Sequence, residues 1–176
     1  MTAADLKAAI RSVPDFPKKG IIFRDITTLL KDPVALRTAI DLLYEHARPL
    51  GVTKVVSVES RGFILGSAVA YRLGAGFVPL RKPGKLPAPT LTQSYSLEYG
   101  EDAIEVHRDA ITPGERVLLH DDLLATGGTI LAAVQLVERM GGVVAGLSFL
   151  VELSFLHPRD RLRGRDIFSL VAYDAG

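Results

Sequence analysis

Short apolar runs alternate with amphipathic stretches along most of the chain. The runs have the length of buried strands and lie at residues 54–58, 77–80, 117–119, 143–151 and 167–171. Segments with helical spacing of apolar residues lie at residues 3–12, 33–47, 63–73 and 130–140. This alternation predicts an α/β fold, with a doubly wound, mostly parallel central sheet flanked by helices, in one domain of residues 1–176.

Two stretches depart from this alternation. Residues 13–28 are rich in turn residues, with a brief apolar run at 21–23 that fits an edge strand. Residues 83–110 have mixed polarity, and 103–106 could pair back as a hairpin. A connection this long in a compact domain is usually functional and often forms a lid. The alternative is a disordered surface excursion.

Composition and charge exclude several classes of protein. The net charge of +1 provides no global field for nucleic acid or an anionic membrane, so neither is expected as a partner. The absence of cysteine excludes disulfides and thiol chemistry and favours a reducing compartment. There is no signal-peptide core and no apolar run that could span a membrane, so we expect a cytoplasmic protein.

The candidate chemistry is densest at residues 117–130, VLLHDDLLATGGTI. Asp121 and Asp122 stand where the predicted strand should end, and they suit two neighbouring ribose hydroxyls or a hydrated Mg²⁺. A loop of small residues follows, formed by Ala125, Thr126, Gly127, Gly128 and Thr129. Backbone N–H groups at the start of a helix attract phosphate, and threonine hydroxyls can donate to the same oxygens. The predicted ligand is a sugar 5-phosphate with a vicinal diol.

Simpler interpretations of this stretch exist. An acidic pair after a strand can be a helix cap or a turn. The loop is not a P-loop, because no lysine follows its glycines. A dinucleotide fingerprint is also absent, because Gly74-Ala75-Gly76 lacks the third glycine.

Polar groups also follow two other predicted strands. They are Glu59, Ser60 and Arg61 after residues 54–58, and Arg81, Lys82 and Lys85 after residues 77–80. Because ligands of such sheets lie beyond the carboxyl ends of the strands, we expect one site that includes the acidic pair. Each basic residue alone could be a surface charge, but together they suit a pyrophosphate. Arg161, Arg163 and Arg165 are interpreted as solvated surface charge, partly offset by Asp160 and Asp166.

The stretch at residues 120–129 resembles the signature with which type I phosphoribosyltransferases bind 5-phosphoribosyl 1-pyrophosphate (PRPP). Further segments resemble the adenine-specific branch of that family over nearly the whole chain: FPKKGIIFRDITTLLKDP (16–33), VVSVESRGFILG (55–66), VPLRKPGKLP (78–87), SYSLEYG (94–100) and LVELSFL (150–156). The resemblance implies a small N-terminal hood, at about residues 1–33, and a flexible lid hairpin, at about residues 83–108. His120 departs from the pattern, since the family usually has an aliphatic residue there.

The resemblance also implies the reaction and the partners. Adenine and PRPP would give AMP and pyrophosphate with Mg²⁺, in a homodimer in which Arg81 lies near the partner's site. Asp121 and Asp122 would hold the ribose hydroxyls and contact Mg²⁺ through water, and the 125–129 loop would hold the 5-phosphate.

The base and its proton have their own expected residues. The backbone of Ile22, Phe23 and Arg24 would read the base, which would stack between Phe23 and Leu123. Glu98 would handle the proton of the purine, beside Tyr99 in the lid, although Glu98 could also be an exposed lid carboxylate. Arg61 is the other expected catalytic residue, because its charge would balance that of the departing pyrophosphate.

Two rival functions remain open at this point. One is a phosphoribosyltransferase for another base, such as hypoxanthine or guanine. The other is a PRPP-binding regulator without catalysis, which would need a nucleic-acid surface that the sequence does not suggest.

Overall fold

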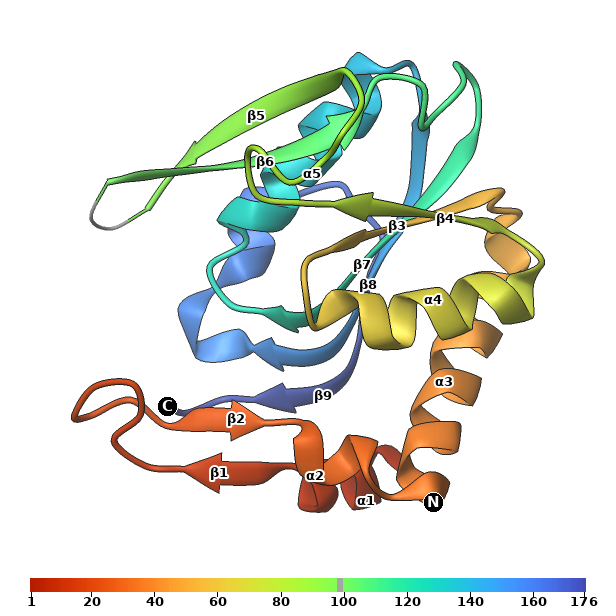
Figure 1. Cartoon of the computed structure of the whole chain (residues 1–176). Coiled ribbons are helices and arrows are strands. Elements are labelled where there is room, and N and C mark those ends of the chain that lie inside the picture. The colour runs from red at the N-terminus through yellow and green to blue at the C-terminus, as the bar shows by residue number, and fades with distance from the viewer. Residues whose placement is uncertain (98–99) are drawn as a thin grey trace.

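The structure is a computed structural model of the chain, and it describes residues 1–97 and 100–176. Its centre is a five-stranded sheet in the order β4-β3-β7-β8-β9 (Figure 1). The strands are β3 (Lys54–Val58), β4 (Gly76–Leu80), β7 (Arg116–Leu124), β8 (Val143–Leu153) and β9 (Ile167–Tyr173). Every neighbouring pair in this sheet is parallel. The predicted doubly wound α/β sheet is therefore confirmed.

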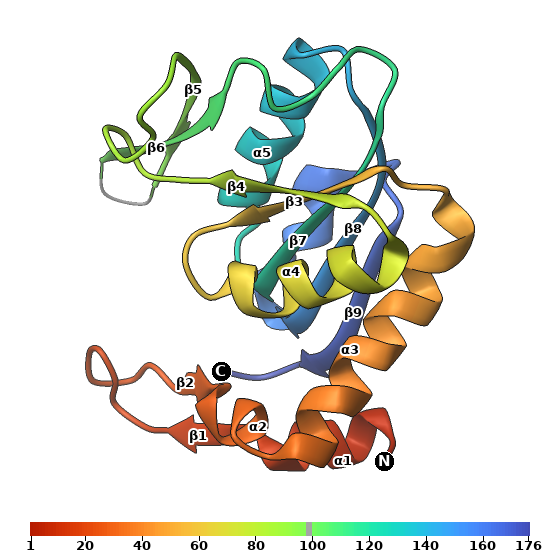
Figure 2. The same cartoon turned by 45° about the vertical axis from the view of Figure 1, so that its right-hand side comes forward.

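Helices cover both faces of the sheet, as Figure 2 shows. On one face lie α3 (Pro33–Ala47) and α4 (Gly62–Leu73), and on the other lies α5 (Gly128–Arg139). Successive strand residues alternate between the two cores: Val55 and Leu118 belong to the first, and Val56 and Leu119 to the second. Burial on both faces explains why these strands read as continuous apolar runs.

The N-terminal segment forms the hood below the sheet (Figure 1). It consists of α1 (Ala3–Ala9), β1 (Arg11–Val13), β2 (Phe23–Asp25) and α2 (Thr27–Leu30), with β1 and β2 antiparallel in a separate sheet. The prediction of a helix over 3–12 was wrong at its end, because Ile10 is buried in an extended conformation that ends α1 and leads into β1. The edge strand lies at 23–25 rather than 21–23, since its register is set by pairing with β1.

The long connection is the predicted hairpin rather than a disordered excursion. Strands β5 (Thr90–Ser96) and β6 (Glu101–His107) pair antiparallel. Ile104 and Val106 are fully buried in the core that includes α5, and Arg81 forms an isolated bridge with Glu105. The base of this lid hairpin is therefore part of the core. Glu98 and Tyr99, between the two strands, lie outside the described residues.

Strand β7 is longer than predicted. It continues to Leu124, so Asp121 and Asp122 lie within the strand and not after it. The continued pairing with β8, through Leu124 and Glu152, explains the extension despite two charged residues. Residues 1–97 and 100–176 also contain three short 3₁₀ helices: η1 (Arg48–Leu50), η2 (Ser154–Leu156) and η3 (Pro158–Leu162). Among the described residues, no helix is long and apolar enough to cross a membrane.

Candidate active site

The small-residue loop connects the end of β7 to the first turn of α5. Gly127 has a φ of +85°, a left-handed conformation that favours glycine, and a Cβ there would lie 3.1 Å from the carbonyl oxygen of Pro158. Within the described part of the chain, no side chain caps the start of α5. The loop lines a small hollow together with Asp121 and Leu123. Backbone N–H groups at this helix start are thus free to meet an anion.

The two carboxylates behind the loop form an unequal pair. The Asp122 carboxylate is buried and lies 2.9 Å from Nε of Arg61. The Asp122 backbone N–H donates to Oδ1 of Asp121 at 2.8 Å. Burial, and then the neighbouring charge of Asp122, raise the pKa of Asp121 well above its ordinary value. Negative charge at Asp121 is therefore disfavoured here until a cation or a hydroxyl donor approaches it.

The basic residues at the strand ends gather around Glu59. The Glu59 carboxylate accepts the Lys82 backbone N–H at 2.6 Å, lies 2.9 Å from Nζ of Lys85 and lies 3.4 Å from Nε of Arg81. Burial opposes ionisation, but these hydrogen bonds and charges outweigh it and lower the pKa of Glu59. An ionised Glu59 fixes the positions of three basic residues.

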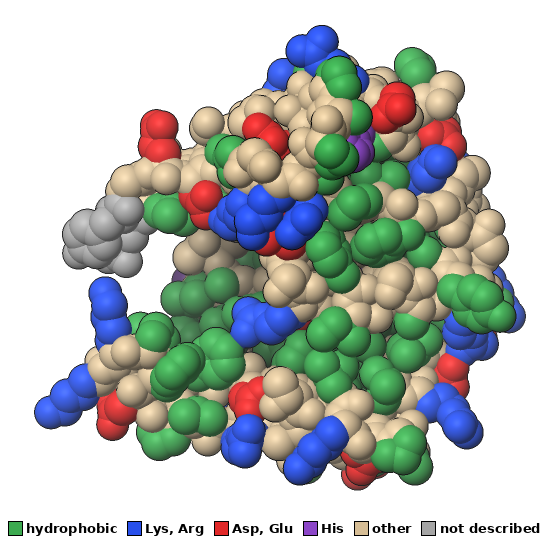
Figure 3. Space-filling view, viewed as in Figure 1, with side chains coloured by type: hydrophobic (Ala, Val, Ile, Leu, Met, Phe, Trp, Pro, Cys, Tyr) green, Lys and Arg blue, Asp and Glu red, His purple; other side chains and the backbone are tan. Residues whose placement is uncertain are grey.

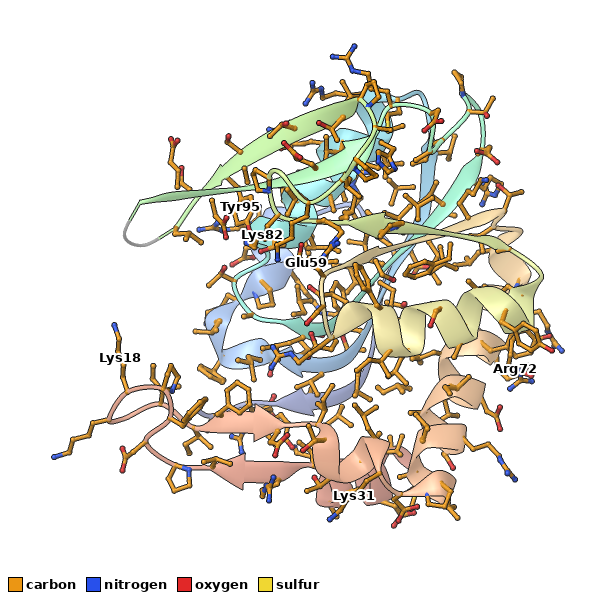
Figure 4. The ribbon with its side chains drawn as sticks, in the orientation of Figure 1. Lys18, Lys31, Glu59, Arg72, Lys82 and Tyr95 are labelled. Carbon is orange, nitrogen blue, oxygen red and sulfur yellow. The ribbon has the colours of Figure 1, made fainter. Side chains whose placement is uncertain are left out.

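The lid hairpin contacts the same cluster. The Lys82 ammonium forms an ion pair with Asp102 and lies 3.4 Å from the Tyr95 hydroxyl (Figure 4). Figure 3 shows a hollow between the hood and the lid hairpin, with basic side chains gathered along its upper edge. Ser60 is exposed at the start of the turn into α4. The strand-end residues therefore meet at one edge of the sheet, as predicted.

Arg61 connects the acidic pair to the residues predicted for the base. Its guanidinium carbon lies 5.4 Å from the Phe23 ring centroid, while its Nε contacts Asp122. Phe23 packs edge-on against Phe16 and lines a pocket with Arg61 and hood residues. Leu123 lines the phosphate hollow instead. Phe23 and Leu123, the two residues predicted to enclose the base, thus line different pockets in this structure.

The Arg24 side chain contacts the hood and the C-terminal segment of the chain. Its side chain reaches the Ser12 hydroxyl at 2.5 Å and the Ala175 carbonyl at 3.2 Å. Its guanidinium also lies 3.9 Å from the Tyr173 ring centroid. Ile22 directly precedes β2 and is half-buried. The role predicted for the backbone of residues 22–24 in reading the base stays a prediction.

A row of buried polar side chains lies behind the acidic pair. Ser57, His120 and Ser148 are register partners on three adjacent strands, and all three are fully buried. His120 Nδ1 lies 2.9 Å from the Ser148 hydroxyl oxygen. Burial lowers the pKa of His120 to about 4, so the imidazole is neutral at neutral pH. The unusual histidine therefore adds no charge beside Asp121.

Sequence reasoning missed one residue near the site. Arg163 is exposed and pairs with Asp160, as expected, whereas Arg165 is half-buried and pairs with Glu138 instead of Asp166. Arg161 is exposed too, but it lines a cavity with lid and loop residues, including Tyr95, Thr126 and Thr129. The available signal was its place after β8, because every strand of a parallel sheet ends at the same edge.

Comparison with known proteins identifies the family. A family model described as the phosphoribosyl transferase domain matches residues 25–165. An adenine phosphoribosyltransferase of Solibacter usitatus (strain Ellin6076) is 58% identical over 97% of this chain and 98% of its own length. The chain belongs to the adenine phosphoribosyltransferase family. The predicted resemblance is confirmed, and so is the predicted class of enzyme, a phosphoribosyltransferase.

Solved members of the family share the whole fold. The crystal structure of adenine phosphoribosyltransferase from Thermoanaerobacter pseudethanolicus ATCC 33223 has a TM-score of 0.95 and 52% identity, covering 98% of this chain and 100% of that one. The enzyme from Saccharomyces cerevisiae was solved with adenine and D-2,5-dideoxy-2,5-imino-altritol 1,6-bisphosphate. It has a TM-score of 0.91 and 38% identity, and the match covers 96% of this chain and 97% of the yeast chain. The type I phosphoribosyltransferase fold is thereby confirmed.

Proposed function

We propose that the chain converts adenine and PRPP to AMP and pyrophosphate, as an enzyme of purine salvage. This activity follows from membership of the family and from the adenine held by the yeast relative. The observation that carries it is the start of α5, which has no side-chain cap among the described residues. It follows the loop of residues 125–127, and two leucines separate that loop from the acidic pair on β7. That order of groups matches a ribose 5-phosphate: the phosphate at the helix start, and the vicinal hydroxyls at the carboxylates.

The ribose 5-phosphate is held at two ends. The N–H groups of the loop and the hydroxyls of Thr126 and Thr129 bind the phosphate, and Asp121 and Asp122 accept hydrogen bonds from the ribose hydroxyls. Because Asp121 has a raised pKa, hydroxyl donors near its oxygens would stabilise its ionised form. Binding at both ends positions the anomeric carbon, which lies between them.

The pyrophosphate lies against the basic residues at the strand ends. Arg81, Lys82 and Lys85 are held by Glu59 and Asp102, and a pyrophosphate would compete for their hydrogen-bond donors. Glu59 itself cannot bind an anion directly, so its part in this subsite is to position the basic residues. Arg61 lies between this group and the base, where its charge balances that of the departing pyrophosphate.

Magnesium fits the same edge of the sheet. Asp121 and Asp122 are adjacent carboxylates whose mutual repulsion a cation would relieve. Across the described residues, no group of three or more acidic, histidine or cysteine side chains could hold a metal ion alone. Two carboxylates, water and substrate oxygens are the usual ligands of Mg²⁺ at such sites. When bound, Mg²⁺ would neutralise charge on the pyrophosphate.

The transfer itself requires few groups. The bond from the anomeric carbon to the pyrophosphate oxygen breaks, the carbon becomes cationic in character, and an adenine nitrogen forms the new bond. The carboxylates on β7 favour the positive charge that develops. The purine loses its imidazole proton, for which Glu98 remains the proposed acceptor. A closed lid would exclude the water that could otherwise hydrolyse PRPP.

The base is proposed to lie at the hood, between Phe23 and Leu123, with the backbone of residues 22–24 along its edge. An aromatic ring and an aliphatic side chain can enclose a flat base on its two faces. The hood of about residues 1–33 thus supplies the base subsite, and the lid hairpin covers the phosphates. A cytoplasmic homodimer in which Arg81 approaches the partner's site completes the proposal.

One assay tests this function against its rivals. The protein is incubated with PRPP, Mg²⁺ and one of adenine, hypoxanthine or guanine, and the nucleotide product is identified by chromatography. We expect AMP from adenine and little product from the other bases. Nucleotide product from hypoxanthine or guanine but not from adenine would show that the enzyme is a phosphoribosyltransferase for another base. Tight PRPP binding with no product from any base would favour the regulator.

A further inference from the structure

Arg161 is placed to reach the same phosphate as the loop. We propose that Arg161 binds the 5-phosphate of the substrate, as a side chain that completes the cradle from the lid side. This inference rests on the proposed function, since it adds a residue to the site that would hold PRPP. The chemical group that it recognises is a phosphate monoester.

The position of the guanidinium is the first observation. Nη1 of Arg161 lies 3.6 Å from the point where a Cβ of Gly128 would stand. Cδ2 of Tyr95 and the carbonyl oxygen of Ser96 lie 3.8 Å and 3.9 Å from the same point. The arginine and the lid strand therefore both lie within van der Waals distance of that point on the first residue of α5.

The shape and chemistry of the cavity agree with this position. Arg161 lines a cavity of about 460 Å³ with lid residues Tyr95, Ser96 and Leu97 and with Thr126, Gly128 and Thr129 of the loop. This volume is in the range of small-ligand sites. The loop offers hydroxyl and N–H donors, and Arg161 adds a guanidinium fork, which matches a phosphate in geometry and charge.

Arg161 has no competing anionic partner among residues 1–97 and 100–176. The other arginines of its segment are paired, Arg159 with Glu152 and Arg163 with Asp160. A cation without an acidic partner beside a helix start would be repelled by the helix dipole. A bound phosphate removes that repulsion, because it attracts both groups.

The segment that carries Arg161 is fixed on both sides. Nε and Nη2 of Arg159 each donate to the buried Glu152 carboxylate at 2.8 Å, and Ser169 donates to it at 2.7 Å. Leu162 is buried in the core beside α5. The backbone of Arg161 is therefore placed before any ligand arrives, which lowers the entropy cost of using its side chain.

The test compares three variants by calorimetric titration with ribose 5-phosphate, AMP and pyrophosphate. Arg161→Gln should weaken ribose 5-phosphate and AMP binding about ten- to a hundredfold, the usual loss of a charge-assisted contact. Arg161→Lys should recover part of the affinity, because it keeps the charge and loses the fork. The matched control is Arg163→Gln, which removes the same charge two residues away and should change both affinities by less than about twofold.

Pyrophosphate serves as the internal control, because it carries no 5-phosphate. Its affinity should stay within about twofold of the wild-type value in all three variants. An unchanged affinity of Arg161→Gln for ribose 5-phosphate would overturn the inference. The inference would also be overturned if Arg163→Gln lost as much affinity for ribose 5-phosphate as Arg161→Gln, or if pyrophosphate affinity fell as much as ribose 5-phosphate affinity. Either result would indicate a general electrostatic effect of the lost charge and not a contact with the 5-phosphate. If the wild-type protein itself bound neither ribose 5-phosphate nor AMP, the proposed function would be refuted, and with it the inference that rests on it.

Steady-state kinetics give a second readout. Arg161→Gln should raise the KM for PRPP while the KM for adenine stays near the wild-type value. Because Arg161 is exposed, the thermal midpoint of the ligand-free variant should match that of the wild-type protein. A purely structural role would instead lower the midpoint and change the kinetics for both substrates.

Discussion

Substitution of Gly66 by alanine should destabilise the protein through one identifiable contact. Gly66 lies on α4 and packs against β3, where a Cβ would meet the Ser57 hydroxyl oxygen at 2.0 Å. The same Cβ would lie 3.1 Å from the Ser57 Cβ and 3.3 Å from Cδ2 of His120. Ser57 is fully buried, so its hydroxyl cannot move into solvent.

The magnitude follows from two opposing effects. Overpacking of a core position costs about 1–3 kcal/mol. Alanine inside a helix is about 1 kcal/mol more favourable than glycine. Because the 2.0 Å approach to the Ser57 oxygen lies far inside contact distance, the overpacking cost should be in the upper part of that range, about 2–3 kcal/mol. We therefore expect Gly66→Ala to lower the free energy of unfolding by about 1–2 kcal/mol.

Removal of the hydroxyl should reverse the loss. The Ser57 hydroxyl has no hydrogen-bond partner in the described part of the chain, so Ser57→Ala alone should be neutral or slightly stabilising. In the double variant the 2.0 Å contact is gone, the approaches of 3.1 Å to the Cβ of residue 57 and 3.3 Å to Cδ2 of His120 remain, and the helix keeps its alanine. Its stability should lie within about 0.5 kcal/mol of the wild-type protein or above it, which gives a coupling energy of about 1 kcal/mol or more.

Urea denaturation followed by far-ultraviolet circular dichroism measures these quantities, at one fixed protein concentration because association would add to stability. The matched control is Ser67→Ala, an exposed neighbour on α4 that should change the free energy of unfolding by less than about 0.5 kcal/mol. A Gly66→Ala variant as stable as the wild-type protein would refute the packing of α4 on β3. Additive effects in the double variant would show that the loss does not arise from Ser57.

Three further predictions concern the site. His120 has a pKa of about 4 in the folded protein and 6.5 in the unfolded chain, so the unfolded state binds the proton first as pH falls. The free energy of unfolding should therefore fall by about 3 kcal/mol as pH drops from 6.5 to 4. Urea denaturation at several pH values measures this loss, and the His120→Leu variant should not show it. Replacement of both Asp121 and Asp122 by asparagine should raise the KM for PRPP and the Mg²⁺ requirement; unchanged steady-state kinetics would remove both from the site. Glu98→Gln should lower kcat by about a hundredfold or more while ribose 5-phosphate binding survives, and near wild-type turnover would exclude Glu98 as the proton acceptor.

Much of the fold was predictable because both faces of each central strand are buried. Runs such as residues 54–58 are then mostly apolar, with valines pointing to both faces, and the strand observed there has the predicted bounds. Element ends were less predictable where tertiary contacts decide them. Ile10 satisfies the helical spacing of α1 but is buried as part of an extended segment, and β7 continues through two aspartates because β8 pairs with it.

The candidate site was also predictable in part. The loop and the acidic pair were predictable because their order along the chain reflects local geometry, a strand followed by a helix start. The partners of the basic residues were not, because Glu59 and Asp102 are distant in sequence from Arg81 and Lys82, respectively. For Arg161, the place of its segment after β8 indicates this edge of the sheet, but only folding shows that its side chain lies beside the loop.

The location of the nucleotide tests the central claim most directly. A crystal structure with AMP should place the 5-phosphate within hydrogen-bond distance of the backbone N–H groups of residues 126–129 and the ribose hydroxyls at Asp121 and Asp122. The base should then lie toward Phe23. AMP bound elsewhere, with the loop empty in the crystal, would contradict the assignment of this edge of the sheet as the active site.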